Sequence, residues 1–292
     1  MTVCVVHKVA KYEVLRGSDP ELLERLSLAD PAMLHRLQQG AQRQAKSLDR
    51  CVAALESAGL PYEVLSRDHF EGAGADVALI LALGGDGTVL DVSHRVLDHP
   101  ILGVNSDPHA SVGYFCACDP YTLASALQRW QDCRIERSRL QRMSLRLNGV
   151  AYPYPCMNDV LVCSRNPAMM SRYVLSAGTR SEEQSSSGIW LATPAGSTAG
   201  IRSAGGTVLP IEEALFQYLV REPYVGKRAR YELLRGVRGL DEGITLRSLM
   251  QDGCLYVDGP YMRLPFVLGD TLEVSRGRPL HLLGMHPDRR ER

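Results

Sequence analysis

The sequence predicts an α/β protein whose N-terminal domain is a doubly wound parallel sheet and whose C-terminal domain is mainly β. Three observations lead to this fold class. Apolar runs alternate with helical patterns in the first half, short strand-like segments follow one another in the second half, and one long apolar run ends at a cluster of glycines. The order strand, helix, strand, helix is typical of parallel sheets with right-handed crossovers.

The first domain, expected over residues 1–133, carries the alternating pattern. Its longest helix is expected over 31–58, where apolar residues recur at spacings of three or four, and Gly59 is the expected stop. Shorter helices are expected over 87–97 and 121–131, and strands over 2–6, 62–65, 76–83 and 100–105. The strand over 76–83 is apolar without alternation, which indicates that both of its faces are buried.

The second domain, expected over 134–276, is mainly β. Asn148 and Gly149 lie between alternating apolar residues, which is the pattern of a tight hairpin. Further strands are expected over 159–164, 172–178, 188–193, 206–210, 244–250, 254–259 and 271–275, and one short helix over 212–220. The tail, residues 277–292, contains one more strand-like piece, which we expect to return to the first domain.

Charge and composition narrow the classes of function. The 292 residues include 33 Lys and Arg and 33 Asp and Glu, so the formal net charge is zero. A nucleic-acid-binding or membrane-surface protein would carry a basic excess, so neither partner is expected. The chain has no apolar run long enough for a membrane span, and its start is too short and polar for a signal peptide. We therefore expect a cytoplasmic protein.

The eight cysteines are scattered along the chain. The close pair Cys116 and Cys118 lacks the spacing of a metal or redox motif. We expect free thiols in a reducing compartment and no metal site built by the protein itself.

The sequence GGDGT, residues 84–88, separates the apolar run from the next helical pattern. Such a junction directs backbone N–H groups and the positive end of a helix dipole at one point, where anions bind. Asp86 does not fit a simple anion cradle, because it places a carboxylate among the donors. An ordinary glycine-rich turn is the alternative. The residues predicted to contact phosphate here are Gly84, Gly85, Gly87 and Thr88.

Two further motifs lie in the second domain. Asn158 and Asp159 enter an apolar strand, a pattern that is also a common turn signal. The segment TPAGSTAG, residues 193–200, follows another strand with small residues that let a backbone press against a flat ligand. A flexible surface loop is the alternative, but the apolar residues before it and the small cluster 203–206 after it disfavour a linker.

These three motifs resemble the signature of the NAD kinases in their order and approximate spacing. GVNSDP at 103–108 and YLVREP at 218–223 resemble the branch that includes the plant NADH kinases. The resemblance covers nearly the whole chain. A turn like GGDGT also occurs in diacylglycerol kinases, sphingosine kinases and phosphofructokinases, whereas the three motifs together are specific.

The resemblance implies an α/β domain and a β domain that bind a dinucleotide. It implies transfer of the γ-phosphoryl group of ATP to the 2′-hydroxyl of the adenosine ribose of NAD+ or NADH, with Mg²⁺ or another divalent cation. Phosphoryl transfer needs positioning and charge stabilisation, and Asp86 would accept the ribose proton as the general base. A homodimer or homotetramer is the expected assembly.

The resemblance also assigns residues to the ligands. Asn158 and Asp159 would meet the ribose, and Gly196 and Ser197 would lie near phosphate. The segment of Gly113, Tyr114 and Phe115 would pack on the substrate, with a core aromatic pair as the alternative. The full set of substrate-binding residues implied in this way is Asp86, Gly87, Tyr114, Phe115, Asn158, Asp159, Ser187, Thr198, Ala199, Gly200 and Ser203.

Three positions depart from the family pattern. Asp159 stands where most members have Glu, Ser187 where they commonly have Asp, and Gly200 where an aromatic residue is usual. A neutral Ser187 should accept the uncharged ring of NADH at least as well as the cationic ring of NAD+. These departures leave the transfer chemistry in place and leave the redox form of the substrate open.

Two other functions remain open from the sequence. A lipid kinase of the same superfamily would need an apolar slot for acyl chains and would not be expected to keep the small-residue motif at 196–206. A dinucleotide-binding sensor without activity is the second alternative, and the complete GGDGT with Asp86 argues against it.

Overall fold

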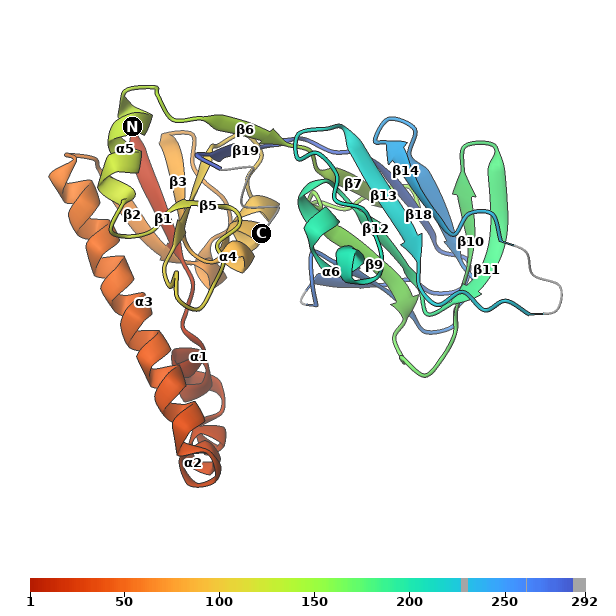
Figure 1. Ribbon diagram of the computed structural model, residues 1–292, viewed down its shortest axis with the longest axis horizontal. Helices are drawn as coiled ribbons and strands as arrows, with labels where there is room; N and C mark the ends of the chain where they lie inside the picture. Colours follow the sequence, from red (N-terminus) through yellow and green to blue (C-terminus); the bar gives the residue numbers. More distant parts are fainter. Residues whose placement is uncertain (227–230, 261, 286–292) are drawn as a thin grey trace. The chain divides into compact units, whose positions relative to one another are not determined.

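The computed structural model describes residues 1–226, 231–260 and 262–285, and the chain divides into two compact units (Figure 1). The first unit contains residues 1–138 and the end of the chain from His281. The second unit contains residues 139–280. The second unit thus begins and ends a few residues later than the domain 134–276 that the sequence predicts.

A seven-stranded sheet with the order β2-β1-β3-β4-β19-β6 forms the first unit, and β5 also pairs with β4. The pairs among β1 to β5, and the pair of β19 with β4, are parallel, which confirms the predicted parallel sheet. The strands are β1 Thr2–His7, β2 Tyr62–Ser66, β3 Val77–Gly84, β4 Ile101–Asn105, β5 Cys116–Cys118, β6 Arg137–Leu140 and β19 Leu280–Leu283.

Helices cover both faces of this sheet. Buried residues of α3 (Pro31–Ser57) and α5 (Leu123–Gln131) pack with alternate residues of β1 and β3. On the other face, Val89 of α4 (Asp86–His94) packs over Gly103 of β4. The three predicted helices are confirmed with small shifts of their ends. Gly59, with φ of +64°, follows α3 as predicted.

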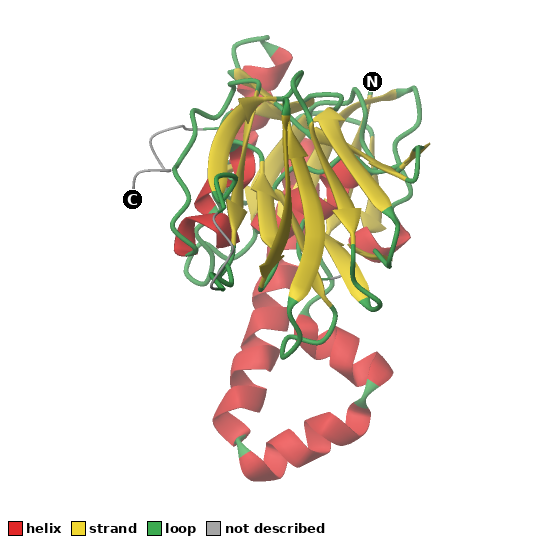
Figure 2. Ribbon diagram, turned by 90° about the vertical axis from the view of Figure 1, so that its right-hand side faces the viewer, coloured by secondary structure: helices red, strands yellow, loops and turns green. Residues whose placement is uncertain are grey.

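Two helices of the first unit were not predicted, α1 (Lys11–Ser18) and α2 (Pro20–Ala29). With the first part of α3 they form a helical arm, seen as the helices at the bottom of Figure 2. Asp19 and Asp30 cap α2 and α3 by accepting backbone N–H groups, and a proline follows each of them. The repeated Asp-Pro pair is a helix-start signal that could have revealed α2.

Two antiparallel six-stranded sheets form the second unit, with orders β11-β10-β15-β18-β7-β8 and β14-β13-β12-β9-β16-β17. Their core holds Tyr173 and Leu246 of the first sheet with Leu191 and Phe216 of the second. The strands are β7 Met143–Leu147, β8 Val150–Ala151, β9 Asp159–Ser164, β10 Ser171–Ala177, β11 Arg180–Ser186, β12 Ile189–Ala192, β13 Leu215–Val220, β14 Arg235–Gly239, β15 Ile244–Ser248, β16 Gly253–Val257, β17 Met262–Pro265 and β18 Thr271–Arg276.

The structure corrects two predictions in this unit. The segment 212–220 is not a helix, because Leu215–Val220 forms β13 between β12 and β14. The segment 206–210 is not a strand, and its first residue packs against the side chain of Gln217. The hairpin at Asn148 and Gly149 is confirmed, because both residues have positive φ, as a tight two-residue turn requires.

The tail of the chain enters the first unit as β19, where Leu282 is in register with Ile101 of β4. The last part of the predicted tail, residues 286–292, lies outside the described residues. Within residues 1–226, 231–260 and 262–285, no helix has the length and apolar character that a membrane crossing requires.

Candidate active site

The turn between β3 and α4 contains Asp86 as the first helical residue, with Gly85 before it in an extended conformation. Gly85 has no side chain to cap the helix, so the first N–H groups of α4 are open to a ligand. A Cβ added to Gly87 would meet no atom within 4 Å, and this residue is exposed. The exposed side of the turn is therefore the backbone around Gly87.

The other two glycines of the turn are required by packing. A Cβ on Gly84 would overlap the side chain of Thr88, and one on Gly85 would lie 2.9 Å from Oγ of Ser111. Thr88 is itself buried, and its N–H donates to the carbonyl of Gly85 at 2.9 Å. Gly84 and Thr88 therefore shape the turn. The phosphate contact predicted for Thr88 would require its N–H to leave the Gly85 carbonyl.

The carboxylate of Asp86 holds a distant segment against the turn. Its Oδ1 accepts the backbone N–H of Phe115 at 2.7 Å. Gly113, with φ of +63°, packs so closely on Asn105 that a side chain would not fit. Phe115 is buried and belongs to the core, whereas Tyr114 is half-buried and its hydroxyl is a buried group without a partner. The predicted residues 84–88 and 114–115 thus lie together.

Basic residues that the sequence analysis missed lie at the same edge of the sheet. Lys8 follows β1, and its backbone N–H donates to the carbonyl of Leu83 at 3.1 Å. Burial lowers the pKa of Lys8. The positive charges of Arg67 and Arg43 lower this pKa further, and the negative charge of Asp107 raises it. Because ligands bind at the carboxyl ends of parallel strands, a cation directly after a strand was the available signal.

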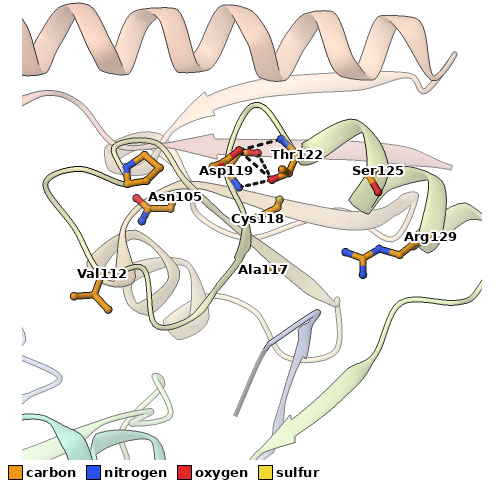
Figure 3. Close-up of a pocket in the computed structure, with 9 residues that line it drawn as sticks. Asn105, Val112, Ala117, Cys118, Asp119, Thr122, Ser125 and Arg129 are labelled. Carbon is orange, nitrogen blue, oxygen red and sulfur yellow. Dashed lines mark hydrogen bonds between the residues drawn. The ribbon is translucent and has the colours of Figure 1, made fainter. Parts of the chain in front are cut away.

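A cavity of about 510 Å³ lies beside the loop that follows β4 (Figure 3). Asn105 and Cys118 line it from the strand ends, and Ser125 and Arg129 line it from α5. In Figure 3 the side chains of Ser125 and Arg129 are directed to the same side of the helix. None of the predicted site residues lines this cavity.

In the second unit, Asp258 holds the turn that contains Asn158 and Asp159. Its carboxylate accepts the backbone N–H groups of Met157 at 2.8 Å, Asn158 at 2.6 Å and Asp159 at 3.0 Å. Asp258 itself has φ of +51°, and its N–H donates to the carbonyl of Asp159 at 2.8 Å. This carboxylate was also missed by the sequence analysis, although it fixes the predicted pair.

The side chains of Asn158 and Asp159 have unused hydrogen-bonding capacity. Oδ1 of Asn158 is buried and has no partner. The Asp159 side chain is buried, and within the described residues its carboxylate accepts no hydrogen bond. Burial, and after it the charge of Asp258, raises the pKa of Asp159 to about 7. Adjacent polar groups left without partners are typical of a ligand site.

The loop after β12 packs directly on this pair. Thr193 donates its Oγ1–H to the carbonyl of Met157 at 2.5 Å and its N–H to the carbonyl of Asn158 at 2.9 Å. Gly196 has no room for a Cβ, because the carbonyl of Asn158 fills the space. The small residue at 196 is therefore explained by its contact with the Asn158 backbone.

The remaining residues of this loop differ in exposure. Ser197 is fully buried; its hydroxyl donates to the carbonyl of Pro194 and accepts the N–H of Leu209. The phosphate contact predicted for Ser197 would require its side chain to leave this position. Thr198 and Ala199 are half-buried, and Gly200 and Ser203 are exposed.

Gly200, the position where an aromatic residue is usual, lies against an aromatic ring. A Cβ there would stand 3.2 Å from Cζ2 of Trp190. The indole of Trp190 packs with Ile201 in a small apolar cluster. The chain therefore presents its aromatic face from β12 rather than from the loop.

Ser187 lies away from the other predicted residues of the second unit. Ala192, at one end of β12, is in register with Asp159, whereas Ser187 precedes the other end. The N–H of Ser187 donates to the carbonyl of Arg221 at 3.0 Å, and the Arg221 guanidinium donates to the carbonyl of Ser187 at 3.4 Å. A charged group therefore already lies beside this position.

Comparison with known proteins gives the family. The family model described as the ATP-NAD kinase N-terminal domain matches residues 22–134. The probable NADH kinase of Oryza sativa subsp. japonica is 32% identical over 277 residues, covering 87% of this chain and 85% of the relative. This chain belongs to the NAD kinase family. The NADH kinase of Arabidopsis thaliana is 28% identical over 276 residues, covering 87% of each chain.

Two solved structures of NAD kinase family members share the fold. An NAD kinase from Archaeoglobus fulgidus in complex with ATP matches with a TM-score of 0.68 and 19% identity, covering 99% of this chain and 95% of that chain. Yeast NADH kinase complexed with NADH matches with a TM-score of 0.69 and 15% identity, covering 99% of this chain and 85% of that chain.

Proposed function

We propose that this NAD kinase family member transfers the γ-phosphoryl group of ATP to the 2′-hydroxyl of the adenosine ribose of NAD+ or NADH. The observation that carries the proposal is Asp86, a half-buried carboxylate at the open start of α4. The solved relatives named above were obtained with ATP and with NADH, respectively, which supports these two ligand classes for the shared fold.

The two oxygens of Asp86 have separate tasks in this proposal. Oδ1 accepts the N–H of Phe115, which fixes the carboxylate, and Oδ2 accepts no hydrogen bond from the described residues. Oδ2 takes the proton of the ribose hydroxyl while that oxygen bonds to the γ-phosphorus and the bond from γ-phosphorus to the bridging oxygen breaks. ADP leaves with the bridging oxygen. The open N–H groups near Gly87 stabilise phosphate oxygens.

The second unit would bind the adenosine. The unpartnered Oδ1 of Asn158 and the carboxyl of Asp159 can each pair with a ribose hydroxyl or an adenine nitrogen. Asp159 is one methylene shorter than the Glu expected from the family, so the ribose must approach the turn more closely. Thr198, Ala199 and Ser203, on the loop after β12, would line the adenine side.

The divalent cation is proposed to arrive with ATP. Within the described ranges, no group of three or more His, Cys, Asp and Glu side chains is arranged to hold a metal ion. A cation that neutralises the triphosphate can keep most of its ligands from phosphate oxygens and water, as Mg²⁺ usually does. Asp86 lies in this turn, so it is a protein group that could contact such a cation. A homodimer or homotetramer is likewise proposed, and sedimentation analysis would measure it.

The substitution Asp86→Asn tests the proposed base. The amide keeps an oxygen for the Phe115 N–H, so the turn should stay in place while the base is lost. We expect kcat to fall by about 10²-fold or more with the dinucleotide still bound, measured with ATP, Mg²⁺ and either NAD+ or NADH.

The matched control is Glu71→Gln, an exposed carboxylate of the same unit, which should leave kcat unchanged. An Asp86→Asn enzyme within a few-fold of wild-type turnover would remove Asp86 from the mechanism. Dinucleotide binding by the wild-type chain without any product would favour the sensor, and phosphorylation of diacylglycerol instead of the dinucleotide would favour the lipid kinase.

A further inference from the structure

A second cavity of the first unit lies between α3 and the loops that follow β4 and β5. Its volume is about 410 Å³, which is within the range of small-molecule sites. One side of it is a face of α3 that carries Arg43, Lys46 and Arg50. These positions are three, four and seven residues apart, so their side chains leave the helix on the same side.

The positive charges of this cavity are only partly balanced. Nε of Arg43 lies 2.7 Å from Oδ2 of Asp107, and the guanidinium of Arg50 lies 4.1 Å above the ring of Tyr121. Lys46 makes no hydrogen bond or ion pair within the described residues. Lys46 and the outer part of Arg50 therefore remain available to an anion.

Two carboxylates and one histidine also line the cavity. The Asp119 carboxylate already accepts the N–H groups of Tyr121 and Thr122, and Asp107 accepts the Arg43 guanidinium. His109 is exposed on the loop after β4. Apart from His109, three cations stand against two carboxylates, so the cavity retains one positive charge, although Oδ1 of Asp107 is buried without a partner.

A buried hydroxyl without a partner gives an independent sign of a ligand. Ser106 lines the cavity and is 4% exposed, and its Oγ makes no hydrogen bond. Its carbonyl is fixed by the hydroxyl of Ser47 at 2.8 Å. A buried hydroxyl without a hydrogen-bond partner is unfavourable, so such groups usually meet a ligand or a water.

We propose that this cavity binds a polyphosphate anion, at a site separate from the turn that contains Asp86. Lys46 and Arg50 supply the charge, and the Ser106 hydroxyl supplies a hydrogen bond to a phosphate oxygen. A carboxylate ligand would use one cation, whereas a diphosphate spans two cations on successive turns of a helix. The cavity volume admits inorganic pyrophosphate or the phosphates of a nucleotide.

The loop after β4, which lines this cavity, is also hydrogen-bonded to the turn that contains Asp86. The N–H of Ser106 donates to the carbonyl of Gly84 at 2.8 Å. An anion that fixes Ser106 therefore also fixes the residue before the turn. An effect of the anion on turnover rests on the proposed function, whereas binding of the anion does not.

The test uses the full chain, with inorganic pyrophosphate as the probe. Titration calorimetry measures its binding. In the wild type we expect two classes of pyrophosphate binding. ATP displaces one class, and the other class either persists in the presence of ATP or is displaced at a different ATP concentration. The double variant Lys46→Ala/Arg50→Ala should lose one class, with at least a tenfold lower affinity. Ser106→Ala, which keeps every charge, should weaken the same class.

The control is Arg25→Ala/Arg36→Ala, which removes the same charge from exposed positions of the helical arm. Equal affinities in the two double variants, or a single class of binding that disappears with saturating ATP, would overturn the proposal. If the wild-type chain shows no kinase activity while the Lys46-dependent binding is present, the proposed function fails and this site stands. Unchanged binding in Ser106→Ala would remove the hydroxyl from the site.

Discussion

At the scale of single residues, Asp159 is the most consequential side chain of the second unit. Its carboxyl is buried beside a second carboxylate, Asp258, which cannot move away because it accepts three backbone N–H groups. The result is a pKa of about 7 where an ordinary aspartate has 3.8. The chain keeps this unfavourable arrangement at the turn where we place the ribose, which is typical of a binding site.

The raised pKa of Asp159 predicts how stability depends on pH. Between about pH 4 and pH 7 the folded chain keeps a proton that the unfolded chain has released, so the free energy of unfolding falls as the pH rises through this window. From about pH 5 to pH 8 the loss due to Asp159 should be on the order of 2–3 kcal/mol. Asp159→Asn should lack it. Urea unfolding of the second unit, followed by Trp190 fluorescence in a Trp130→Phe background, measures the difference.

Asp252→Asn, which alters an exposed carboxylate of the same unit, is the control and should keep the wild-type slope. An Asp159→Asn chain with the same pH dependence as wild type would show that Asp159 keeps an ordinary pKa.

The sequence revealed some of these residues and not others for a physical reason. Asp86 was singled out because the turn that contains it, residues 84–88, is continuous in the sequence. Asp258 was not assigned a role, because it acts on Asn158 across 100 residues, through the pairing of β9 with β16. A single sequence carries no signal for such a pairing. Lys8 was overlooked although its position directly after β1 was a usable signal.

At the scale of elements, the parallel strands were easier to predict than β13. Strands such as β3 end at glycines and are followed by helical spacing, so pattern and punctuation agree. In β13, Phe216 packs into the core and Leu219 packs with Trp190 on the other face, so the apolar residues do not alternate. Glu212, Glu213 and Ala214 before it favour a helix, and the strand neighbours β12 and β14 override that preference.

The positions of Asp159 and Ser187 along β12 indicate how the dinucleotide must lie if Ser187 contributes to specificity. Asp159 is beside one end of β12 and Ser187 is beside the other, so the ligand must extend along the strand. Under this arrangement, Ser187→Asp should shift the ratio of kcat/KM for NADH and NAD+ toward NAD+ by several-fold. Arg221 should pair with the new carboxylate and limit the shift. Ser187→Asp/Arg221→Gln should therefore shift the ratio further.

Both substrates should be assayed at equal ATP and Mg²⁺, with the products separated by chromatography so that oxidation of NADH is not counted as turnover. Arg221→Gln alone removes the positive charge beside this position, so it should shift the ratio toward NAD+ by less than Ser187→Asp/Arg221→Gln does. A ratio unaffected by both Ser187 variants would show that the nicotinamide ring lies elsewhere.

At the scale of the whole molecule, the chain leaves the first unit at Ser138 and returns to it at His281. The returning strand β19 lies between β4 and β6 in the sheet order, and the N–H of Gly284 donates to the carbonyl of Glu136 at 2.8 Å. The first unit therefore cannot complete its sheet until the second unit has been synthesised. Its stability depends on residues at the far end of the sequence.

This arrangement predicts separate responses of the two units to cavities of equal size. Leu282 of β19 and Leu272 of β18 are both fully buried, and each Leu→Ala change should cost on the order of 2–5 kcal/mol. Leu282→Ala should speed amide hydrogen exchange in β3 and β4, far along the sequence, and leave β15 and β16 protected. Leu272→Ala should do the reverse. Mass spectrometry of peptides from both units reads the two patterns, and loss of protection throughout the chain in either variant would mean that the units unfold as one cooperative body.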